Sequence, residues 1–312
     1  MNLRIGSRGS QLALWQANHI AALLRNEGHN VDIRIIKTTG DQLQLVTFAQ
    51  VGTKGMFTRE IEEALAAGSV DLAVHSLKDL PTELPEPFIL AATPERVDPR
   101  DVLVSVKYEN LAALPQGARV GTSSQRRRAQ LKAVRPDINA VEFRGNVDTR
   151  LRKLAEGQVD AILLAAAGLD RLDRTDWVRE RLEPQVFCPA AGQGALGIET
   201  RKNDAATLVA VAFLNDLPTR FAVTVERAAL AALGGGCQVP IGIHCRAALR
   251  EGTELWDEVF AVVAAPETGY AVRVFHRSPH PGTDPATLGQ LVAQKLIDAG
   301  AKPLLAAAGG VR

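Results

Sequence analysis

Residues 3–36, "LRIGSRGSQLALWQANHIAALLRNEGHNVDIRII", contain the pattern that predicts the fold. The apolar start of this segment, residues 3–6, predicts a short strand. A helix follows, and its apolar face is formed by Ala13, Ala17, Ile20, Ala21 and Leu24. Gly28 marks the end of that helix, and the alternating residues 31–36 predict a second strand. Strand, helix and strand in this order indicate a parallel β-sheet.

The same pattern continues and then recurs further along the chain. After a long loop, residues 57–68 predict a helix and residues 70–74 predict a buried strand. Later segments echo earlier ones in the same order: 118–131 echoes 3–14, 138–148 echoes 31–41, and 151–165 echoes 61–74. The chain is therefore expected to contain two alike α/β lobes, with the ligand in the cleft between them, outside the carboxyl ends of the strands.

From about residue 217 the pattern changes to that of a small α+β domain. A helix, a glycine-rich turn, three alternating apolar runs and a last helix follow one another, at residues 220–233, 234–237, 241–249, 254–265, 269–277 and 284–300. Three neighbouring alternating runs predict an antiparallel sheet.

Composition describes an ordinary globular protein of two or three domains: 312 residues, 46% hydrophobic, 23% charged, with a formal charge of +1. So small a charge argues against general binding to nucleic acid or to a membrane surface. The amino terminus lacks the apolar run of a signal peptide, and no apolar stretch is long enough to span a membrane, so we expect a cytoplasmic protein. The cysteines, Cys188, Cys237 and Cys245, suit neither a disulfide framework nor a zinc site, and no metal is expected.

Arginines gather in the loops that follow the predicted strands: Arg8, Arg126, Arg127, Arg144, Arg150 and Arg171. Hydroxyl groups stand at the predicted helix starts beside them: Ser10, Thr122, Ser123 and Ser124. A helix amino terminus attracts anions, and arginine adds planar donors that match carboxylate or phosphate. Any one of these arginines taken alone reads as an ordinary surface charge. Their clustering at one sheet edge predicts a ligand with several negative charges.

The class of anion stays open at this point. Phosphate, a phosphosugar, nucleic acid and a polycarboxylate all fit clustered arginines. Aromatic residues are only 4% of the chain and none lies within the arginine run 126–128, which disfavours base stacking. Two α/β lobes around an anion also describe solute receptors and regulatory modules without enzyme activity.

The segment 70–81, "VDLAVHSLKDLP", places Asp79 just past a buried strand. Beside Lys78 and near His75, this carboxylate is suited to proton transfer or to holding a developing positive charge. The alternative is an aspartate that merely shapes the turn before Pro81. His75 is expected to be a hydrogen-bonded structural residue.

Two further loops carry candidate groups. The connection 40–57 is long enough to form a lid, and Lys54 within it would bring a cation over a bound anion, unless it is simply a surface lysine. In "LGGGCQVPIG", residues 233–242, Cys237 follows three glycines that provide no side chains for it to pack against. An accessible thiol there suits covalent attachment or nucleophilic chemistry, although a loop cysteine without a role remains the alternative. Cys188 and Cys245 are expected to be structural.

Taken together, these motifs resemble the porphobilinogen deaminase family, whose members are also called hydroxymethylbilane synthases. The resemblance covers nearly the whole chain in family order: "VGTKGMF", "VDLAVHSLKDLP", "RVDPRD", "VGTSSQRRRAQL", "FRGNVDTRL", "AILLAAAGLDRL", "PAAGQGALGIE" and "GGGCQVPIG". So many motifs in sequence are far more specific than any one of them.

The resemblance implies an α/β fold of two type II periplasmic-binding-protein-like lobes plus a small α+β C-terminal domain. Lobe 1 would comprise residues 1–95 with 195–214 and carry the catalytic aspartate and the flexible loop. Lobe 2 would comprise residues 96–194 and bind anions through its arginines, and residues 217–312 would carry the cysteine that attaches the cofactor.

The resemblance further implies a transferase of haem-type tetrapyrrole biosynthesis, working as a cytoplasmic monomer without nucleic acid or membrane. It would join four porphobilinogen molecules into hydroxymethylbilane and release ammonia each time. The reaction would be primed by a dipyrromethane cofactor held through a thioether to Cys237, with Asp79 as the catalytic residue. Cofactor and substrate carboxylates, and their polar neighbours, would be bound by Arg8, Ser10, Lys54, Ser76, Lys78, Thr122, Ser124, Arg126, Arg127, Arg144, Asn146, Arg150, Arg171 and Gln193.

Two positions depart from the family pattern. Gly234 stands where many relatives carry a charged residue, and "GTKG" at 52–55 replaces a more usual double glycine before the lysine. Neither change removes a functional group named above. They bear on the mobility of the loop and the stability of the cysteine turn.

Overall fold

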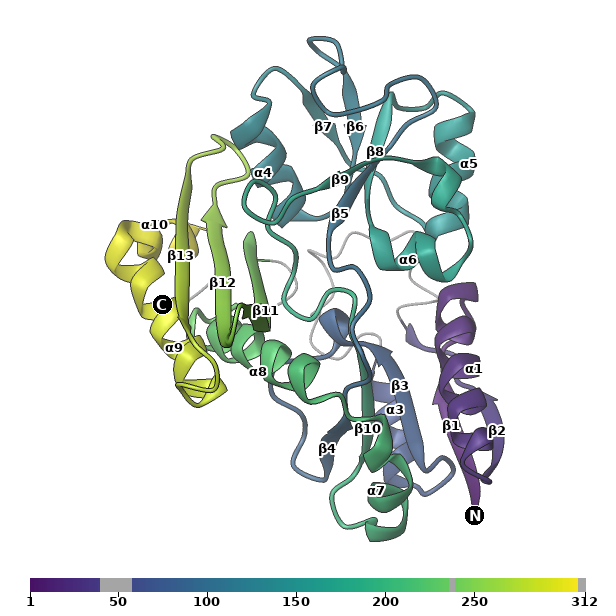
Figure 1. Ribbon diagram of the computed structural model, residues 1–312. Coiled ribbons are helices and arrows are strands. Elements are labelled where there is room, and N and C mark those ends of the chain that lie inside the picture. Colours follow the sequence, from purple (N-terminus) through teal and green to yellow (C-terminus); the bar gives the residue numbers. More distant parts are fainter. Residues whose placement is uncertain (40–57, 236–238, 308–312) are drawn as a thin grey trace. The chain divides into compact units, whose positions relative to one another are not determined.

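The computed structural model describes residues 1–39, 58–235 and 239–307 of the chain (Figure 1). The chain folds into two units. The first unit is made of Met1–Arg96 with Ala195–Arg220, and the second of Val97–Gly194 with Phe221–Arg312. The chain therefore leaves the first unit after Arg96 and returns to it at Ala195.

A five-stranded sheet forms the centre of the first unit, in the order β2-β1-β3-β10-β4. β1 runs parallel to β2 and β3, whereas β10 is antiparallel to both of its neighbours. The strands are β1 Asn2–Ser7, β2 Asn30–Ile35, β3 Leu72–Ser76, β4 Phe88–Ala92 and β10 Leu196–Arg201. The helices are α1 Gln11–Asn26, α3 Arg59–Ala66, the short turn η2 Leu77–Asp79, α7 Ala205–Val211 and the short turn η4 Ala212–Leu214.

The helix α1 packs on this sheet through the face that the sequence predicts. Ala17, Ile20, Ala21 and Leu24 are fully buried against the strands. Gln16 is also buried, although the apolar pattern does not predict this. Its side-chain amide donates a hydrogen bond to Ser76 Oγ at 2.7 Å. A polar side chain can be buried at such a point when it finds a hydrogen-bond partner.

A second five-stranded sheet, in the order β7-β6-β8-β5-β9, forms the first part of the second unit. β6 runs parallel to β7 and β8, whereas β5 is antiparallel to β8 and β9. The strands are β5 Asp101–Val104, β6 Arg119–Gly121, β7 Asn139–Val141, β8 Ala161–Ala165 and β9 Val178–Leu182. The helices are α4 Gln125–Val134, α5 Val147–Ala155, α6 Ala166–Arg171 and the short turn η3 Thr175–Trp177.

The two sheets have the same topology. In each one, the first strand of the repeat lies between the second and the third in parallel, and an antiparallel strand separates the third from the edge strand. This arrangement confirms the two alike lobes that the repeated segments predict. The expected fold class, two such α/β lobes with a small α+β part, is therefore confirmed.

The second unit also contains the three-stranded antiparallel sheet β11-β12-β13. The strands of this sheet are β11 Ile241–Glu251, β12 Glu254–Ala264 and β13 Ala271–Pro279. The helices are α8 Leu217–Ala232, whose first four residues belong to the first unit, α9 Pro285–Leu296, the wide helical turn η5 Ile297–Ala301 and α10 Lys302–Ala307. The sequence predicts one helix over 284–300, and α9 together with the wide turn η5 follows that range, with only Gly300 leaving helical backbone angles. Gly300, with φ of 98°, adopts the left-handed conformation that breaks a helix.

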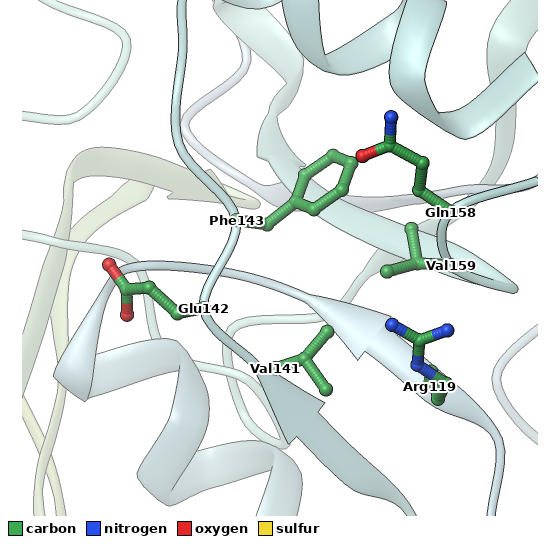
Figure 2. Close-up of a pocket in the computed structure, with 6 residues that line it drawn as sticks. All are labelled: Arg119, Val141, Glu142, Phe143, Gln158 and Val159. Atoms are coloured by element: carbon green, nitrogen blue, oxygen red, sulfur yellow. The ribbon is translucent and has the colours of Figure 1, made fainter. Parts of the chain in front are cut away.

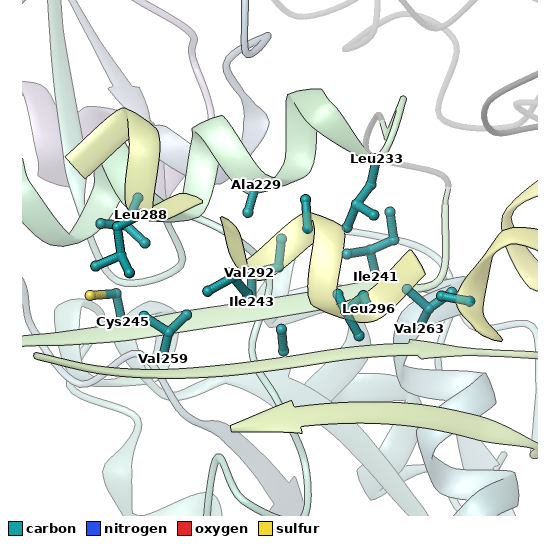
Figure 3. Packing of buried hydrophobic residues seen from close by; sticks show 14 of the residues in the cluster. Ala229, Leu233, Ile241, Ile243, Cys245, Val259, Val263, Leu288, Val292 and Leu296 are labelled. Carbon is teal, nitrogen blue, oxygen red and sulfur yellow. The ribbon is translucent and has the colours of Figure 1, made fainter. Parts of the chain in front are cut away.

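Apolar side chains of α8, α9, β11 and β12 meet in one core, shown in Figure 3. Cys245 belongs to this core and is 2% exposed. Cys188 is buried as well, and its thiol donates to the Phe260 carbonyl at 3.4 Å. Burial raises the pKa of the Cys188 thiol, so the group stays protonated. Both cysteines fit the structural role that the sequence predicts for them.

Candidate active site

In the second unit, one sheet edge collects the ends of several strands. β6, β7 and β8 run parallel, so their carboxyl ends meet at that edge, and α4, α5 and α6 begin there. β5 runs the opposite way and begins at the same edge, with Asp101 opposite Ala165 of β8. This is the edge where ligands bind in open α/β sheets.

Asp101 at this edge holds two arginines of α4. Arg126 Nη1 donates to Asp101 Oδ2 at 2.6 Å, and Arg126 Nη2 donates to Oδ1 at 3.3 Å. Arg127 donates to the same Oδ1 through Nε at 2.9 Å and Nη2 at 2.8 Å. The side chains are 6%, 7% and 0% exposed for Arg126, Arg127 and Asp101, so water does not screen these charges.

The carboxyl of Asp101 is ionised. Burial alone would raise its pKa, but the charges of Arg126 and Arg127 and their hydrogen bonds outweigh burial and lower the pKa far below its usual range. Gln193 adds a donor, because its Nε2 lies 2.9 Å from Asp101 Oδ1 and 2.7 Å from the Pro99 carbonyl. Two guanidinium groups share one carboxylate, and the cluster keeps a net positive charge.

Backbone carbonyls fix the same arginines from other directions. Arg126 Nη1 donates to the Cys188 carbonyl at 2.7 Å, and Arg127 Nη1 donates to the Leu163 carbonyl at 3.1 Å. Gln130, one turn along α4, forms two hydrogen bonds with the backbone of Cys188. Its Nε2 donates to the Cys188 carbonyl at 2.9 Å, and its Oε1 accepts from the Cys188 N–H at 2.7 Å. The arginine cluster is therefore a rigid part of the fold rather than a pair of surface side chains.

Sequence reasoning missed Asp101, although it ends the quoted motif at 96–101. Nothing near it in the chain indicates that its carboxylate pairs with residues of α4. The ligand contacts expected of Arg126 and Arg127 remain predictions, now with a protein carboxylate already bound to both.

Arg150, in the first turn of α5, has a different environment. Its Nε is buried and has no hydrogen-bond partner among the described residues. Burial, together with the neighbouring charges of Arg127 and Arg144, lowers the pKa of Arg150 to about 10, and the charge of Glu142 partly opposes this shift. An anion beside this guanidinium would offset the cost of burying its charge and the repulsion from the neighbouring arginines.

The other arginines of this edge are tied to the protein. Arg171, at the end of α6, donates through Nη2 to the Gly194 carbonyl at 2.8 Å, and burial lowers its pKa to about 10. Arg144 is half-buried, and its Nε donates to Glu142 Oε1 at 2.6 Å. Both nevertheless lie in the loops or helices that follow β7 and β8, as the sequence predicts.

The predicted hydroxyl and amide groups cap the helices. Ser124 Oγ accepts from the Arg127 N–H at the start of α4, and Asn146 Oδ1 accepts from the Thr149 N–H at the start of α5. Thr122 is buried, and its Oγ1 accepts from the Ser124 N–H at 3.2 Å. A capping hydroxyl still has its own proton to donate, so capping does not prevent contact with an anion.

In the first unit, the predicted residues follow β1 and β3. Ser10 caps α1 by accepting from the Ala13 N–H at 3.3 Å, and Arg8 precedes it. Ser76 ends β3, and the short turn η2 places Lys78 half-buried and Asp79 exposed.

The turn that carries Asp79 is well anchored. Leu77 is buried, and its N–H donates to the Ala195 carbonyl at 3.0 Å. His75 Nε2 lies 2.8 Å from Glu199 Oε2, and both side chains are buried, as expected of a structural histidine. Asp79 is thus an exposed carboxylate on a fixed turn.

Two expected residues, Lys54 and Cys237, lie outside the described residues. The convergence of the two sets of side chains on one cleft likewise stays a prediction. A hollow of about 370 Å³ in the second unit is lined by other residues: Arg119, Val141, Glu142, Phe143, Gln158 and Val159 (Figure 2). None of the predicted site residues lines it.

Within 1–39, 58–235 and 239–307, no group of three or more His, Cys, Asp or Glu side chains is arranged to hold a metal ion. In the same ranges no single helix is long and apolar enough to cross a membrane. Only Ala205–Leu214 and Leu217–Ala232 taken together reach that length, across a bend of 105°.

Comparisons with known proteins agree with the sequence motifs. The family model "Porphobilinogen deaminase, dipyromethane cofactor binding domain" matches residues 3–229, and "Porphobilinogen deaminase, C-terminal domain" matches residues 220–298. A porphobilinogen deaminase of Roseiflexus castenholzii is 50% identical over 307 residues, covering 98% of this chain and 99% of that protein. One of Nitratidesulfovibrio vulgaris is 48% identical over 311 residues, covering 97% and 96%.

The solved structures that resemble this chain are distant from it in sequence. A methionine-binding lipoprotein of Bacillus subtilis has a TM-score of 0.43 at 12% identity, covering 68% of this chain and 89% of that one. The family models match most of the chain, and both relatives are nearly half identical or more over almost its full length. The chain therefore belongs to the porphobilinogen deaminase family.

Proposed function

We propose that this protein joins four porphobilinogen molecules into hydroxymethylbilane, releasing one ammonia for each. It does so with Asp79 as the catalytic residue and the arginines of the second unit as the carboxylate-binding groups. The observation that supports this most is the buried cluster of Asp101, Arg126 and Arg127, which keeps a net positive charge at the ligand edge of the sheet. The cluster belongs to a chain whose family model is that of the dipyrromethane cofactor domain.

The residues of the second unit fit a cofactor of this kind. A dipyrromethane carries acetate and propionate carboxylates, which need cationic donors. Arg126 and Arg127 together have one more positive charge than Asp101 neutralises, and Arg150 has a buried Nε without a hydrogen-bond partner in the described part of the chain. A cofactor carboxylate would balance the remaining positive charge of the Asp101–Arg126–Arg127 cluster and accept a hydrogen bond from Arg150. Attachment through a thioether at Cys237 follows from the family resemblance.

When bound, the dipyrromethane supplies the pyrrole carbon to which the first substrate is joined. The arginines of the chain hold carboxylates and thereby orient the rings that carry them. A hydrogen bond between two charged groups contributes about 1.5–3 kcal/mol, more than a neutral one. Because these guanidiniums are already fixed by Asp101, Cys188 and Leu163, little rotamer entropy is lost on binding.

Asp79 is proposed to transfer a proton and to stabilise positive charge on the substrate. Loss of ammonia from an aminomethyl group leaves positive charge on the substrate, and a ring proton must depart after coupling. An exposed carboxylate on an anchored turn can stabilise that charge and accept that proton. Proton transfer by a positioned group is worth typically ~10²–10⁴-fold in rate.

The remaining residues are proposed to support these two roles. Arg8, Ser10, Ser76 and Lys78 contribute polar and cationic contacts in the first unit, and Lys54 does so from the loop at 40–57. Thr122, Ser124, Arg144, Asn146, Arg171 and Gln193 do the same in the second unit. The protein is proposed to act as a cytoplasmic monomer, with lobes at 1–95 plus 195–214 and at 96–194 and the cysteine-bearing domain at 217–312.

The test replaces Asp79 with alanine. The variant should fold and carry a covalent adduct, seen as added mass on the peptide containing Cys237, but form hydroxymethylbilane at least ~100-fold more slowly. Glu83→Ala is the matched control, because Glu83 is an exposed carboxylate shortly after Asp79. It should keep normal turnover. Near-normal hydroxymethylbilane formation by Asp79→Ala would refute the assignment, and an unmodified wild-type chain that leaves porphobilinogen unconsumed would refute the function.

A further inference from the structure

We infer that Asp101 is a positioning residue, whose carboxylate holds Arg126 and Arg127 together as one preformed receptor for a ligand carboxylate. The inference rests on the proposed function. Asp101 makes four hydrogen bonds to these guanidiniums, at 2.6–3.3 Å, and is 0% exposed. It therefore acts through the arginines and never contacts the ligand itself.

The guanidinium of Arg126 retains donors beyond this internal pairing. Arg126 has five N–H groups and spends three of them on Asp101 and the Cys188 carbonyl. An arginine whose plane is fixed on one edge presents its other donors in one direction. This is the geometry that bidentate carboxylate recognition needs.

The position of Asp101 is itself fixed by the fold. It is the first residue of β5 and pairs with Ala165 on one side and Leu182 on the other. Gln193 donates to the same Oδ1 that receives Arg127. A carboxylate held by two strand neighbours and three side chains gives its arginines one orientation.

A role of Asp101 through its charge and a role through its position predict opposite changes in carboxylate binding. The two roles can therefore be told apart by experiment. Removing the Asp101 charge makes the cluster more positive, so a site governed by net charge alone would bind a carboxylate more tightly. If Asp101 sets the orientation of the two arginines, its removal weakens carboxylate binding despite the added positive charge.

The experiment compares four purified holoenzymes: wild type, Asp101→Asn, Asp101→Glu and the control Asp98→Asn. Asp98 is matched because it also binds two arginines, Arg100 and Arg181, in the same unit and outside the proposed site. Each protein is measured for KM and kcat with porphobilinogen, for the fraction of chains with a covalent adduct by intact mass, and for its melting temperature.

Asp101→Asn should raise KM about tenfold with a smaller change in kcat, and should lower the fraction of loaded chains. Asp101→Glu keeps the charge but displaces the carboxylate, and should raise KM less. Asp98→Asn should lower the melting temperature and leave KM, kcat and the fraction of loaded chains unchanged.

A KM for Asp101→Asn that equals or falls below the wild-type value, with normal loading, overturns the inference. If Asp101→Asn gives no soluble protein, the glutamate variant decides: a raised KM supports the inference and a wild-type KM overturns it. A wild-type protein that neither carries an adduct nor consumes porphobilinogen refutes the proposed function instead, so the two failures are distinguishable.

Discussion

Glu226 of α8 links two distant backbone segments of the second unit, and its replacement by glutamine should destabilise that unit. Its carboxylate is fully buried and accepts from two N–H groups, from Gly192 at 2.6 Å through Oε2 and from Cys245 at 2.8 Å through Oε1. His244 Nδ1 lies 3.3 Å from Oε1. Glutamine keeps the shape but has only one oxygen, so one of the two N–H groups then faces an NH₂ group.

The magnitude follows from those contacts. A buried donor left without an acceptor costs about 1–3 kcal/mol, and the other hydrogen bond loses about 1 kcal/mol with the charge. The total is about 3 kcal/mol of unfolding free energy. For a unit of this size that corresponds to a melting temperature lowered by about 6–12 °C.

Scanning calorimetry of Glu226→Gln beside wild type measures this shift. Glu251→Gln is the control, because Glu251 is 58% exposed and pairs with Arg277 at the surface, where an ion pair contributes about 0–1 kcal/mol. Its melting temperature should move by at most about 4 °C. A Glu226→Gln protein that melts together with wild type would show that these two hydrogen bonds do not support the second unit.

Two further perturbations test other parts of the fold. Burial opposes ionisation of Asp71, but hydrogen bonds from Arg4 outweigh burial and lower the pKa of this carboxyl. The stability that the Asp71–Arg4 pair contributes is therefore present above the ordinary pKa of about 4 and is lost as pH falls through the lowered value. Asp71→Asn should therefore be less stable than wild type in urea at pH 7, and the gap should narrow towards pH 2; a gap that widens in acid contradicts this sign. Gly242→Ala would place a Cβ atom 2.7 Å from the Cys188 carbonyl, which binds Arg126, and should cost about 1–3 kcal/mol in urea unfolding. Wild-type stability of that variant would mean that the backbone there yields without cost.

The sequence predicts the elements of this protein well where the pattern is local. The apolar face of α1, the strands β1, β2 and β3 and the three antiparallel strands from residue 241 onward are read from periodicity, whereas β4, β5, β9 and β10 were not predicted. The repeat of segments along the chain predicts two lobes of the same topology, and the structure has them. The helix predicted over 284–300 is present as α9 and the wide turn η5, and Gly300, with its positive φ, breaks it where the prediction ends.

The candidate site was likewise predicted in part from the sequence. The arginines are found at the sheet edge because parallel strands end together, so residues that follow strands in the sequence become neighbours in space. The residue types in those loops were enough to predict an anionic ligand. What each arginine touches was not predictable from the loops alone.

The amino-acid sequence by itself determined the repeated strand–helix–strand units, the doubling of the α/β lobe and the chemistry of the loops, because each depends on residues close together in the chain. Only the tertiary structure decided that Asp101 holds Arg126, 25 residues away, and Gln193, 92 residues away. Such a pairing depends on which strand ends and helix starts the sheet brings to one edge. A buried charge must find its partner there, wherever that partner lies in the sequence.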